Sequence, residues 1–205
     1  MKCKVCGAES GQYVFYPACA TNSVLDIAGS GTNNGANVAL WTYNGCGAQM
    51  FWITHTIPVT PEDLGDEFVA KITNTSTGKN VSVEGSSNVA QYENNTDLAQ
   101  QWRFERQSDG SYKLTNIRYG LCMDVNGASS ASDTNIQLWD DIGSTAQRWF
   151  IYRVNGSYVF RPACSDTCVL DLDWASSDNY ANIQTWTYHG GDAQLFQINK
   201  IDDKP

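Results

Sequence analysis

The sequence is poor in several residue types that many protein functions require. Its 205 residues include only 5 Pro, 3 Met and 2 His, and 13 Lys and Arg stand against 22 Asp and Glu, for a net charge of −9. A chain with this charge balance is a poor partner for a nucleic-acid backbone or an anionic membrane surface. No apolar run is long enough to span a bilayer. We therefore expect neither nucleic-acid binding nor membrane insertion.

Catalytic motifs are also scarce. His55 and His189 lie far apart in the chain without an obvious partner, and we expect both side chains to be solvated. No Ser or Cys lies in a nucleophile motif, and no Gly-rich loop has the spacing that cradles phosphate. We expect Asp171 and Asp173 to face opposite sides of a strand and so to make a poor acid/base pair. The chain is therefore predicted to be no enzyme and to need no cofactor.

The 7 cysteines leave alternatives open. Cys164 and Cys168 flank a three-residue turn, so a disulfide across a hairpin is geometrically feasible. Cys3 and Cys6 have the spacing of half a zinc knuckle, but no second pair with this spacing follows. We predict no metal site. We expect no signal peptide before the first aromatic-rich segment.

Short apolar and aromatic runs dominate the remaining sequence. The 7 Trp, 10 Tyr and 7 Phe lie mostly in such runs, which Gly, Asn, Ser and Asp separate. No stretch sustains a helical period, so the pattern predicts an all-β protein.

One pattern occurs in four copies. Asp124 is followed 15 residues later by Trp139 and 8 residues after that by Gln147, and both offsets recur in two further copies. The fourth copy keeps the second offset, from Tyr92 to Gln100, but has Ser82 in place of the Asp. Three features are shared by all copies: Ala before the Gln, an aromatic two residues after it, and Asn four residues before the loop aromatic. Such regularity is the signature of a repeat protein.

The repeats define the organisation of the chain. Residues 1–11 are a short polar lead, 12–56 form repeat one, and 57–66 read as a linker that contains Pro58 and Pro61. Residues 67–200 hold repeat two (67–106), repeat three (112–153) and repeat four (158–200). The motif Gln residues of repeats two to four are spaced by 47 residues each time, so these repeats form one even unit. Repeat one stands apart.

These copies, each of four short strands ending in Gln-x-aromatic, resemble the ricin B-chain-like β-trefoil lectins. They are most similar to the bacterial carbohydrate-binding modules with QxW repeats, through Val24-Leu25-Asp26-Ile27, Ala181-Asn182-Ile183-Gln184 and the motif glutamines. The resemblance implies a β-trefoil built from repeats two to four, with a six-stranded barrel capped by three hairpins, plus repeat one as an additional N-terminal trefoil-type repeat. It also implies that Trp102, Trp149 and Phe196 fill the core. Gln100, Gln147 and Gln194 are expected to bond the backbone.

The resemblance further implies one shallow sugar site per repeat. An Asp accepts hydrogen bonds from sugar hydroxyls, a Gln bonds another hydroxyl, and an aromatic ring covers the C–H face of the sugar. Repeat two lacks this set, with Ser82, Ala90 and Tyr92, and we expect its site to be inactive. The candidate carbohydrate-binding residues are Asp124, Gln137 and Trp139 in repeat three, Asp171, Gln184 and Trp186 in repeat four, and Asp26 and Trp41 in repeat one, which has Ala39 at the Gln position.

Each of these residues also has a purely structural interpretation. An Asp at a strand end can cap a turn, and a Trp there can simply pack. Trp174, beside the repeat-four site, is either a ligand contact or a surface aromatic. The joint presence of Asp, Gln and Trp in repeats three and four, against their loss in repeat two, favours binding.

The predicted function is therefore a non-catalytic lectin module that targets an attached or associated protein to a glycan. We expect it to be secreted or at a cell surface as part of a larger protein. The alternative is a β-trefoil that binds or inhibits a protein without binding sugar, since this fold serves both purposes. Repeat one leaves three alternatives: it packs on the trefoil, it joins other copies into a homo-oligomer, or it is a remnant of a longer protein.

Overall fold

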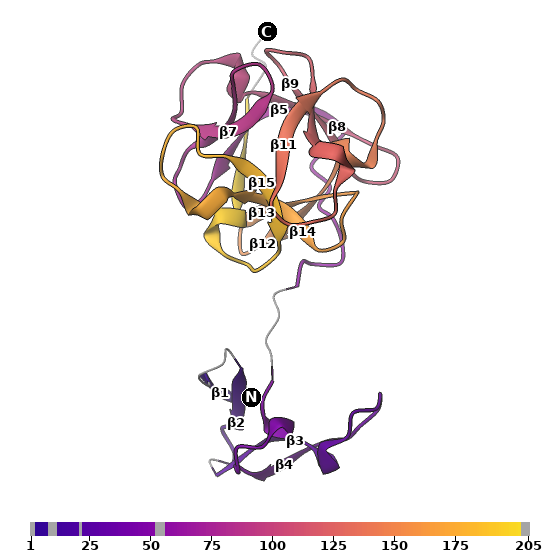
Figure 1. The fold of residues 1–205 in the computed structure, drawn as a ribbon, viewed down its shortest axis with the longest axis vertical. Helices are drawn as coiled ribbons and strands as arrows, with labels where there is room; N and C mark the ends of the chain where they lie inside the picture. The colour runs from indigo at the N-terminus through magenta and orange to yellow at the C-terminus, as the bar shows by residue number, and fades with distance from the viewer. Residues whose placement is uncertain (1–2, 8–11, 21, 52–55, 202–205) are drawn as a thin grey trace. The chain divides into compact units, whose positions relative to one another are not determined.

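The structure is a computed structural model that describes residues 3–7, 12–20, 22–51 and 56–201. It consists of two compact units, Met1–Thr54 and His55–Pro205 (Figure 1). Strands and short 3-10 turns make up the regular structure of both units. Among the described residues, no helix has the length and apolar character needed to cross a membrane.

The larger unit contains a closed barrel of six antiparallel strands. In order around the barrel they are β5 (Glu67–Asn74), β8 (Trp102–Arg106), β9 (Tyr112–Asn116), β12 (Arg148–Val154), β13 (Ser157–Pro162) and β16 (Phe196–Lys200). The last strand pairs again with the first, from Phe196 opposite Asn74 to Lys200 opposite Ala70. Closure leaves no free edge in the barrel. This ring confirms the predicted six-stranded barrel.

Three hairpins cap the barrel, one from each of repeats two, three and four. They are β6 (Asn80–Glu84) with β7 (Asn88–Tyr92), β10 (Cys122–Val125) with β11 (Thr134–Trp139), and β14 (Cys168–Leu172) with β15 (Ile183–Thr187). The recurring Asn residues join the hairpins: Asn135 Nδ2 donates to Asn88 Oδ1 at 3.0 Å, and Asn88 Nδ2 donates to Asn182 Oδ1 at 3.2 Å. The fold is therefore a β-trefoil, as predicted.

The aromatic residue after each motif Gln lies in the core of the trefoil. Trp102, Trp149 and Phe196 are fully buried. The indole nitrogens are satisfied, because Trp102 Nε1 donates to the carbonyl of Val81 at 3.1 Å and Trp149 Nε1 to that of Met123 at 3.2 Å. The three predicted core aromatics are confirmed.

Each motif Gln fastens the turn between a cap hairpin and the next barrel strand. Gln147 Nε2 donates to the carbonyl of Asp140 at 2.7 Å, and Gln147 Oε1 accepts from the amide of Ile142 at 3.0 Å. Gln100 and Gln194 make the same pair of bonds in repeats two and four, with donor distances of 2.7 Å to Glu93 and 3.0 Å to Thr187. All three are buried, and their predicted role in bonding the backbone is confirmed.

The smaller unit holds two separate hairpins. They are formed by β1 (Cys3–Gly7) with β2 (Tyr13–Pro17), and by β3 (Ser23–Ile27) with β4 (Val38–Thr42). Strand β1 lies in the stretch expected to be a polar lead, so this lead contributes a strand to the unit. The side chains of Cys3 and Cys6, and all of His55, lie outside the described residues.

Apolar side chains of the β3–β4 hairpin are exposed where their counterparts in the trefoil are buried. Val38 and Leu40 are 52% and 45% exposed, whereas Ile136 and Leu138, at the matching positions of repeat three, are 0% and 2% exposed. The burial of this face in the trefoil comes from the neighbouring repeats. Repeat one has no such neighbours within its own unit.

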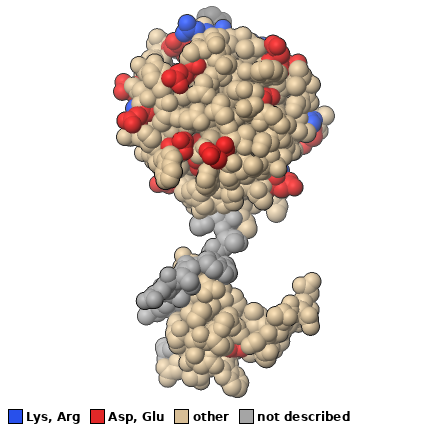
Figure 2. All heavy atoms as spheres, viewed as in Figure 1, with Lys and Arg blue, Asp and Glu red and all other residues tan. Residues whose placement is uncertain are grey.

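The end of the predicted linker is attached to the trefoil. The amide of Glu62 donates to the carbonyl of Ile151 at 2.7 Å, and the amide of Leu64 donates to Tyr112 Oη at 2.8 Å. Residues 62–65 thus belong to the larger unit. The face of that unit seen in Figure 2 carries more acidic than basic side chains, in line with the net charge of −9.

Cys164 and Cys168 are free thiols, so the disulfide that their spacing allows is not formed. Their sulfurs instead contact the loop of repeat three, with Cys164 Sγ 3.7 Å from the carbonyl of Ser129 and Cys168 Sγ 3.4 Å from that of Ser130. The two thiols help to fasten one repeat to the next.

Candidate functional site

The cap hairpins bring the candidate residues of repeats three and four together. Asp124 lies directly opposite Gln137 across the β10–β11 pair, and Trp139 follows two residues later on the same face of the strand. Gln137 Nε2 donates to Asp124 Oδ1 at 3.2 Å. Repeat four reproduces this arrangement, with Gln184 Nε2 donating to Asp171 Oδ1 at 3.3 Å.

In both repeats a recessed carboxylate lies beside an exposed ring. Asp124 and Asp171 are only 5% and 4% exposed, whereas Trp139 and Trp186 are 52% and 41% exposed. Burial raises the pKa of both carboxyl groups, and the hydrogen bonds from the neighbouring Gln residues partly oppose the rise. A ligand whose hydroxyl groups donate to these carboxylates would restore the bonds that they lose with water. The exposed ring would cover an apolar face of the same ligand.

Repeat one contains the incomplete set that its sequence predicts. Asp26 lies opposite Ala39, and Trp41 lies on the same hairpin with 63% of its surface exposed. The motif Gln49 Nε2 donates to Asp26 Oδ2 at 2.9 Å, and the motif Gln residues of repeats three and four likewise bond Asp124 and Asp171. This hairpin therefore keeps the acceptor and the ring but has one polar side chain fewer.

The corresponding surface of repeat two is engaged by another part of the trefoil. Ser82 lies opposite Ala90, so the acceptor and its amide partner are both missing. The ring of Tyr180, from the loop of repeat four, packs against Tyr92 with 4.7 Å between the ring centroids. The neighbouring Gln91 is buried and its Nε2 donates to the carbonyls of Ser176 and Asp178 at 2.7 and 2.9 Å. The hairpin surface of repeat two is thus covered by the loop of repeat four, whereas the corresponding surfaces of repeats three and four carry exposed Trp rings.

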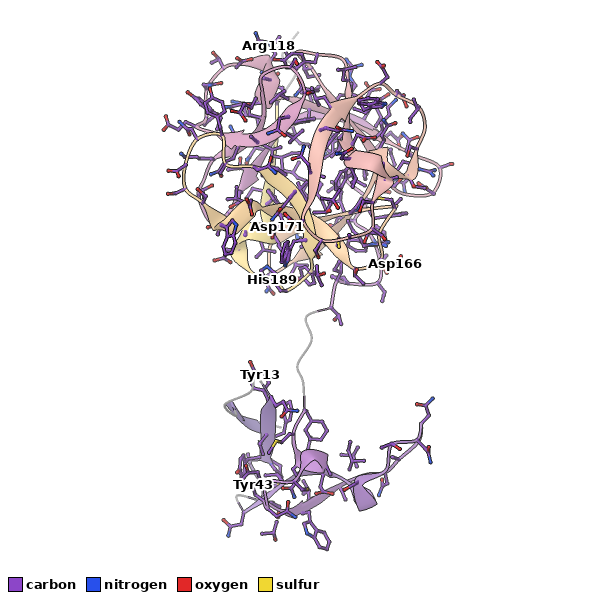
Figure 3. The ribbon with its side chains drawn as sticks, viewed as in Figure 1. Tyr13, Tyr43, Arg118, Asp166, Asp171 and His189 are labelled. Atoms are coloured by element: carbon purple, nitrogen blue, oxygen red, sulfur yellow. The ribbon has the colours of Figure 1, made fainter. Side chains whose placement is uncertain are left out.

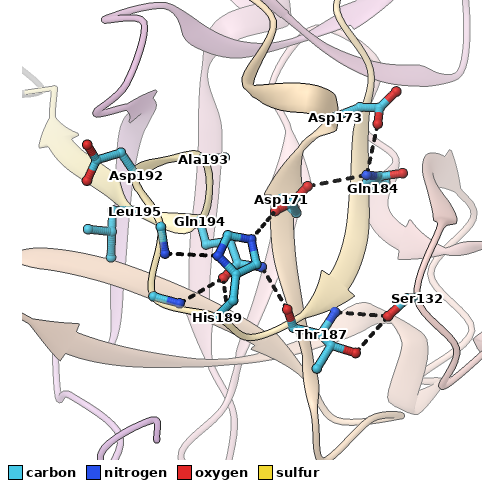
Figure 4. A network of polar contacts seen from close by, with 12 residues as sticks. Ser132, Asp171, Asp173, Gln184, Thr187, His189, Asp192, Ala193, Gln194 and Leu195 are labelled. Atoms are coloured by element: carbon cyan, nitrogen blue, oxygen red, sulfur yellow. Dashed lines mark hydrogen bonds and ion pairs between the residues drawn. The ribbon is translucent and has the colours of Figure 1, made fainter. Parts of the chain in front are cut away.

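Repeat four forms a pocket with a volume of about 380 Å³. Asp171, Gln184 and Trp186 line it, together with further residues that were not among the candidates, including four with charged, polar or aromatic side chains. These four are Asp133, Asp173, Trp174 and His189. Figure 4 shows the polar contacts on one side of this pocket. A volume near the lower end of the usual range for small-molecule sites fits a ligand of limited size.

The expectation that Asp171 and Asp173 face opposite sides is wrong. Gln184 Nε2 donates to Asp173 Oδ1 at 3.1 Å as well as to Asp171. Residues two apart in an extended chain share a face, and Asp173 begins the 3-10 turn η6 (Asp173–Ala175) directly after the strand. The two-residue spacing in the sequence was the signal that places both carboxylates in one pocket.

His189 is also not simply solvated. Its Nε2 lies 3.9 Å from Asp171 Oδ2, and its Nδ1 accepts from the amide of Gly191 at 3.2 Å. Figures 3 and 4 show the imidazole next to Asp171. His189 follows Trp186 by three residues, at the position whose amide bonds the motif Gln194, so the fixed turn aims the ring at the pocket.

The match to a protein family and the matches to solved structures agree on the fold. The sequence matches the family described as ricin-type beta-trefoil lectin domain-like over residues 5–98, 62–139, 98–186 and 145–204. The chain belongs to this family. The repeated, overlapping matches follow the four sequence repeats. No curated protein matches the chain.

Solved structures similar to this family member include a designed threefold-symmetric protein, ThreeFoil. It is 30% identical, with a TM-score of 0.63 over 65% of this chain and 99% of that chain. The ricin B-like lectin of Macrolepiota procera, solved in complex with lactose, is 18% identical, with a TM-score of 0.60 over 68% of this chain and 100% of its own. A mosquitocidal holotoxin is 18% identical, with a TM-score of 0.64, and 98% of this chain spans 24% of the toxin.

The family is one of lectins and is generally non-catalytic. Among the described side chains, no group of three or more His, Cys, Asp or Glu is arranged to hold a metal ion.

Proposed function

We propose that the trefoil binds carbohydrate without catalysis, at one site in repeat three and one in repeat four. The matched set of recessed carboxylate, bonded amide and exposed ring carries this proposal. Asp124, Gln137 and Trp139 form the first site, and Asp171, Gln184 and Trp186 form the second. Asp26 and Trp41 provide a weaker third site in repeat one, because Ala39 supplies no amide.

Sugar hydroxyls suit the chemistry of these sites. Each carboxylate accepts hydrogen bonds from the cross-strand Gln and from the motif Gln, and it keeps lone pairs for hydroxyl donors. Hydrogen bonds to a charged group contribute about 1.5–3 kcal/mol each, enough for weak but selective binding of a sugar. Two such sites on one rigid trefoil strengthen attachment to a branched or polymeric glycan by raising the effective concentration. We infer that the module targets an attached or associated protein to such a glycan.

The test is binding to a glycan array, followed by titration of the best ligand into single-site variants. Asp124→Ala and Asp171→Ala should each remove one site, and the double variant should stay folded and keep at most the weak binding of repeat one. Ser82→Ala, at the same strand position in repeat two, is the matched control and should leave binding unchanged. Unchanged titration curves for the double variant would refute these sites. No binding on the array, with a protein partner recovered instead, would favour the protein-binding alternative.

A further inference from the structure

Trp174 adopts a backbone conformation that a Trp rarely takes. Its φ is +53°, in the left-handed region, at the centre of η6. The matching residues of repeats one and three are Gly29 and Gly127, both with φ of +64°. Glycine adopts this conformation freely, whereas side-chain-bearing residues do not. Repeat four therefore keeps a large side chain where the fold itself favours glycine.

The ring of Trp174 stands in solvent at the edge of the repeat-four pocket. It is 93% exposed, compared with 41% for Trp186 on the neighbouring strand β15. Both rings line the same pocket, one from η6 and the other from the hairpin. Since Trp174 packs so little within the protein, its strain is not offset by burial. Backbone strain of this kind is concentrated at ligand-binding sites.

The loop that follows Trp174 is firmly anchored to repeat two. Lys79 Nζ donates to Asn179 Oδ1 at 2.8 Å, and the main chain of Tyr180 bonds Gln91 at 2.8 Å. Gln91 Nε2 donates hydrogen bonds to the carbonyls of Ser176 and Asp178, and the ring of Tyr180 packs on that of Tyr92. The unused face of repeat two thus fixes the base of the loop. A ring on a fixed base loses less entropy when it meets a ligand.

The repeat-four pocket also has hydrogen-bond acceptors and bordering residues that the repeat-three site lacks. Asp173 adds a second carboxylate beside Asp171, where repeat three has Asn126 after Asp124. Asp133, from the loop of repeat three, borders the pocket and is held by a bond from its amide to the carbonyl of Thr185 at 2.8 Å. The equivalent loop beside repeat three is the short turn at residues 85–87.

We propose that the repeat-four site binds two consecutive sugar units of an oligosaccharide, with Trp186 as the platform for the first and Trp174 as the platform for the second. This inference rests on the proposed function. Asp171 and Gln184 serve the first unit, and Asp173 serves the hydroxyls of the second. The repeat-three site, with Gly127 in place of the second ring, holds one unit. Repeat four is the site that distinguishes an oligosaccharide from its component sugars.

The experiment uses the whole chain carrying Asp124→Ala, so that repeat four dominates binding. Calorimetric titrations compare galactose with lactose and β-1,3-galactobiose, and xylose with xylobiose. We expect a disaccharide to bind about tenfold more tightly than its monosaccharide, the gain that one aromatic platform supplies. Trp174→Gly should abolish this gain and leave the monosaccharide affinity within about twofold. Because glycine is the residue of repeats one and three, the variant should not melt at a lower temperature than its parent.

The outcomes separate this inference from the function on which it rests. If the Trp174→Gly variant still binds the disaccharide more tightly than the monosaccharide, or loses affinity equally for both sugars, Trp174 is not a second platform, although carbohydrate binding itself is not contradicted. Failure of the unsubstituted chain to bind any glycan on an array removes both. The indole N–H resonance of Trp174, assigned by its absence from the Trp174→Gly spectrum, gives an independent measurement. It should shift with the disaccharide and remain in place with the monosaccharide; a shift with both would contradict the assignment.

Discussion

At the scale of single residues, Asp124 and Asp171 combine two opposing requirements. Burial makes each carboxylate a strong acceptor within a recessed site, but it also disfavours the charged form and raises the pKa of both groups. The folded state therefore binds the proton more tightly than the unfolded chain does. At neutral pH these carboxylates lower the stability of the trefoil, and this cost diminishes as the pH falls through the raised pKa.

Sugar affinity should have the opposite pH dependence. Hydroxyl donors bind the charged carboxylate, so affinity should be constant near neutral pH and fall as each raised pKa is approached from above. At repeat four, His189 and Asp173 also face Asp171, the first lowering and the second raising its pKa. Titrations between about pH 7.5 and 4.5 on the Asp171→Ala variant isolate Asp124, whose pKa is raised mainly by burial. Affinity that stays constant down to the ordinary range of an Asp pKa would contradict this prediction.

Trp149 is expected to contribute to folding stability, and Trp139 to sugar binding. Trp149 is fully buried and Trp139 is 52% exposed, although they lie only ten residues apart. Trp149→Ala should lower the free energy of unfolding by about 3–5 kcal/mol because it opens a core cavity. Trp139→Ala should change it by about 0.5 kcal/mol or less. Thermal and denaturant unfolding check both values, and equal losses would mean that the inward and outward aromatics have been confused.

At the scale of the elements, the sequence predicted what short-range patterns encode. The offsets between Asp124, Trp139 and Gln147 identified the hairpin, the fastening glutamine and the outward ring. The sequence did not predict that Asp133 and the residues around Tyr180 reach into neighbouring repeats. Those contacts join residues that are distant in the chain, and the spacing of residues within one repeat does not encode them. His189 was missed for a similar reason, since its direction depends on the turn that Gln194 holds.

The anchored loop of repeat four gives a prediction at this scale. Tyr180→Ala removes the ring that packs on Tyr92, an aromatic contact that contributes about 0.5–1.5 kcal/mol. We expect faster amide exchange in residues 173–182 and weaker sugar binding at repeat four, because Trp174 and Asp173 lose their fixed base. Binding at repeat three should be unaffected. Tyr119→Phe, which removes the bond from Tyr119 Oη to the carbonyl of Gly85, is a control in a different loop contact and should not change exchange in residues 173–182.

At the scale of the whole trefoil, each loop packs on the next repeat. The turn of repeat two bonds β11 through the amide of Leu138 and the carbonyl of Ser87 at 2.7 Å. The loop of repeat three bonds β15 through Asp133, and the loop of repeat four bonds β7 through Tyr180. The loss of the site residues and the shortening of the turn in repeat two therefore affect both repeat three and repeat four. Its short turn leaves the repeat-three site less enclosed, while its unused face supports the loop that builds the repeat-four pocket.

Repeat one has the face of a trefoil repeat, but its own unit lacks the neighbouring hairpins that cover this face in the trefoil. Val38, Leu40 and Trp41 are 52%, 45% and 63% exposed, and Asn37 is exposed as well. In the trefoil the matching Asn residues bond one another, and residues such as Ile136 are buried by the adjoining hairpins. Three copies of repeat one around a threefold axis would restore both features. Exposed apolar faces of this kind promote association.

We therefore expect the whole chain to associate through repeat one, while residues 55–205 remain monomeric. The shorter fragment begins at His55 because residues 62–65 are bonded to the trefoil. Light scattering at increasing concentration measures both species, and the double change Val38→Asp with Leu40→Asp should return the whole chain to a monomer by placing like charges on the face. Asp63→Asn, on the larger unit, is a control that should not alter assembly. If the whole chain and the fragment are both monomers at high concentration, association through repeat one is wrong, and the face is covered in some other way.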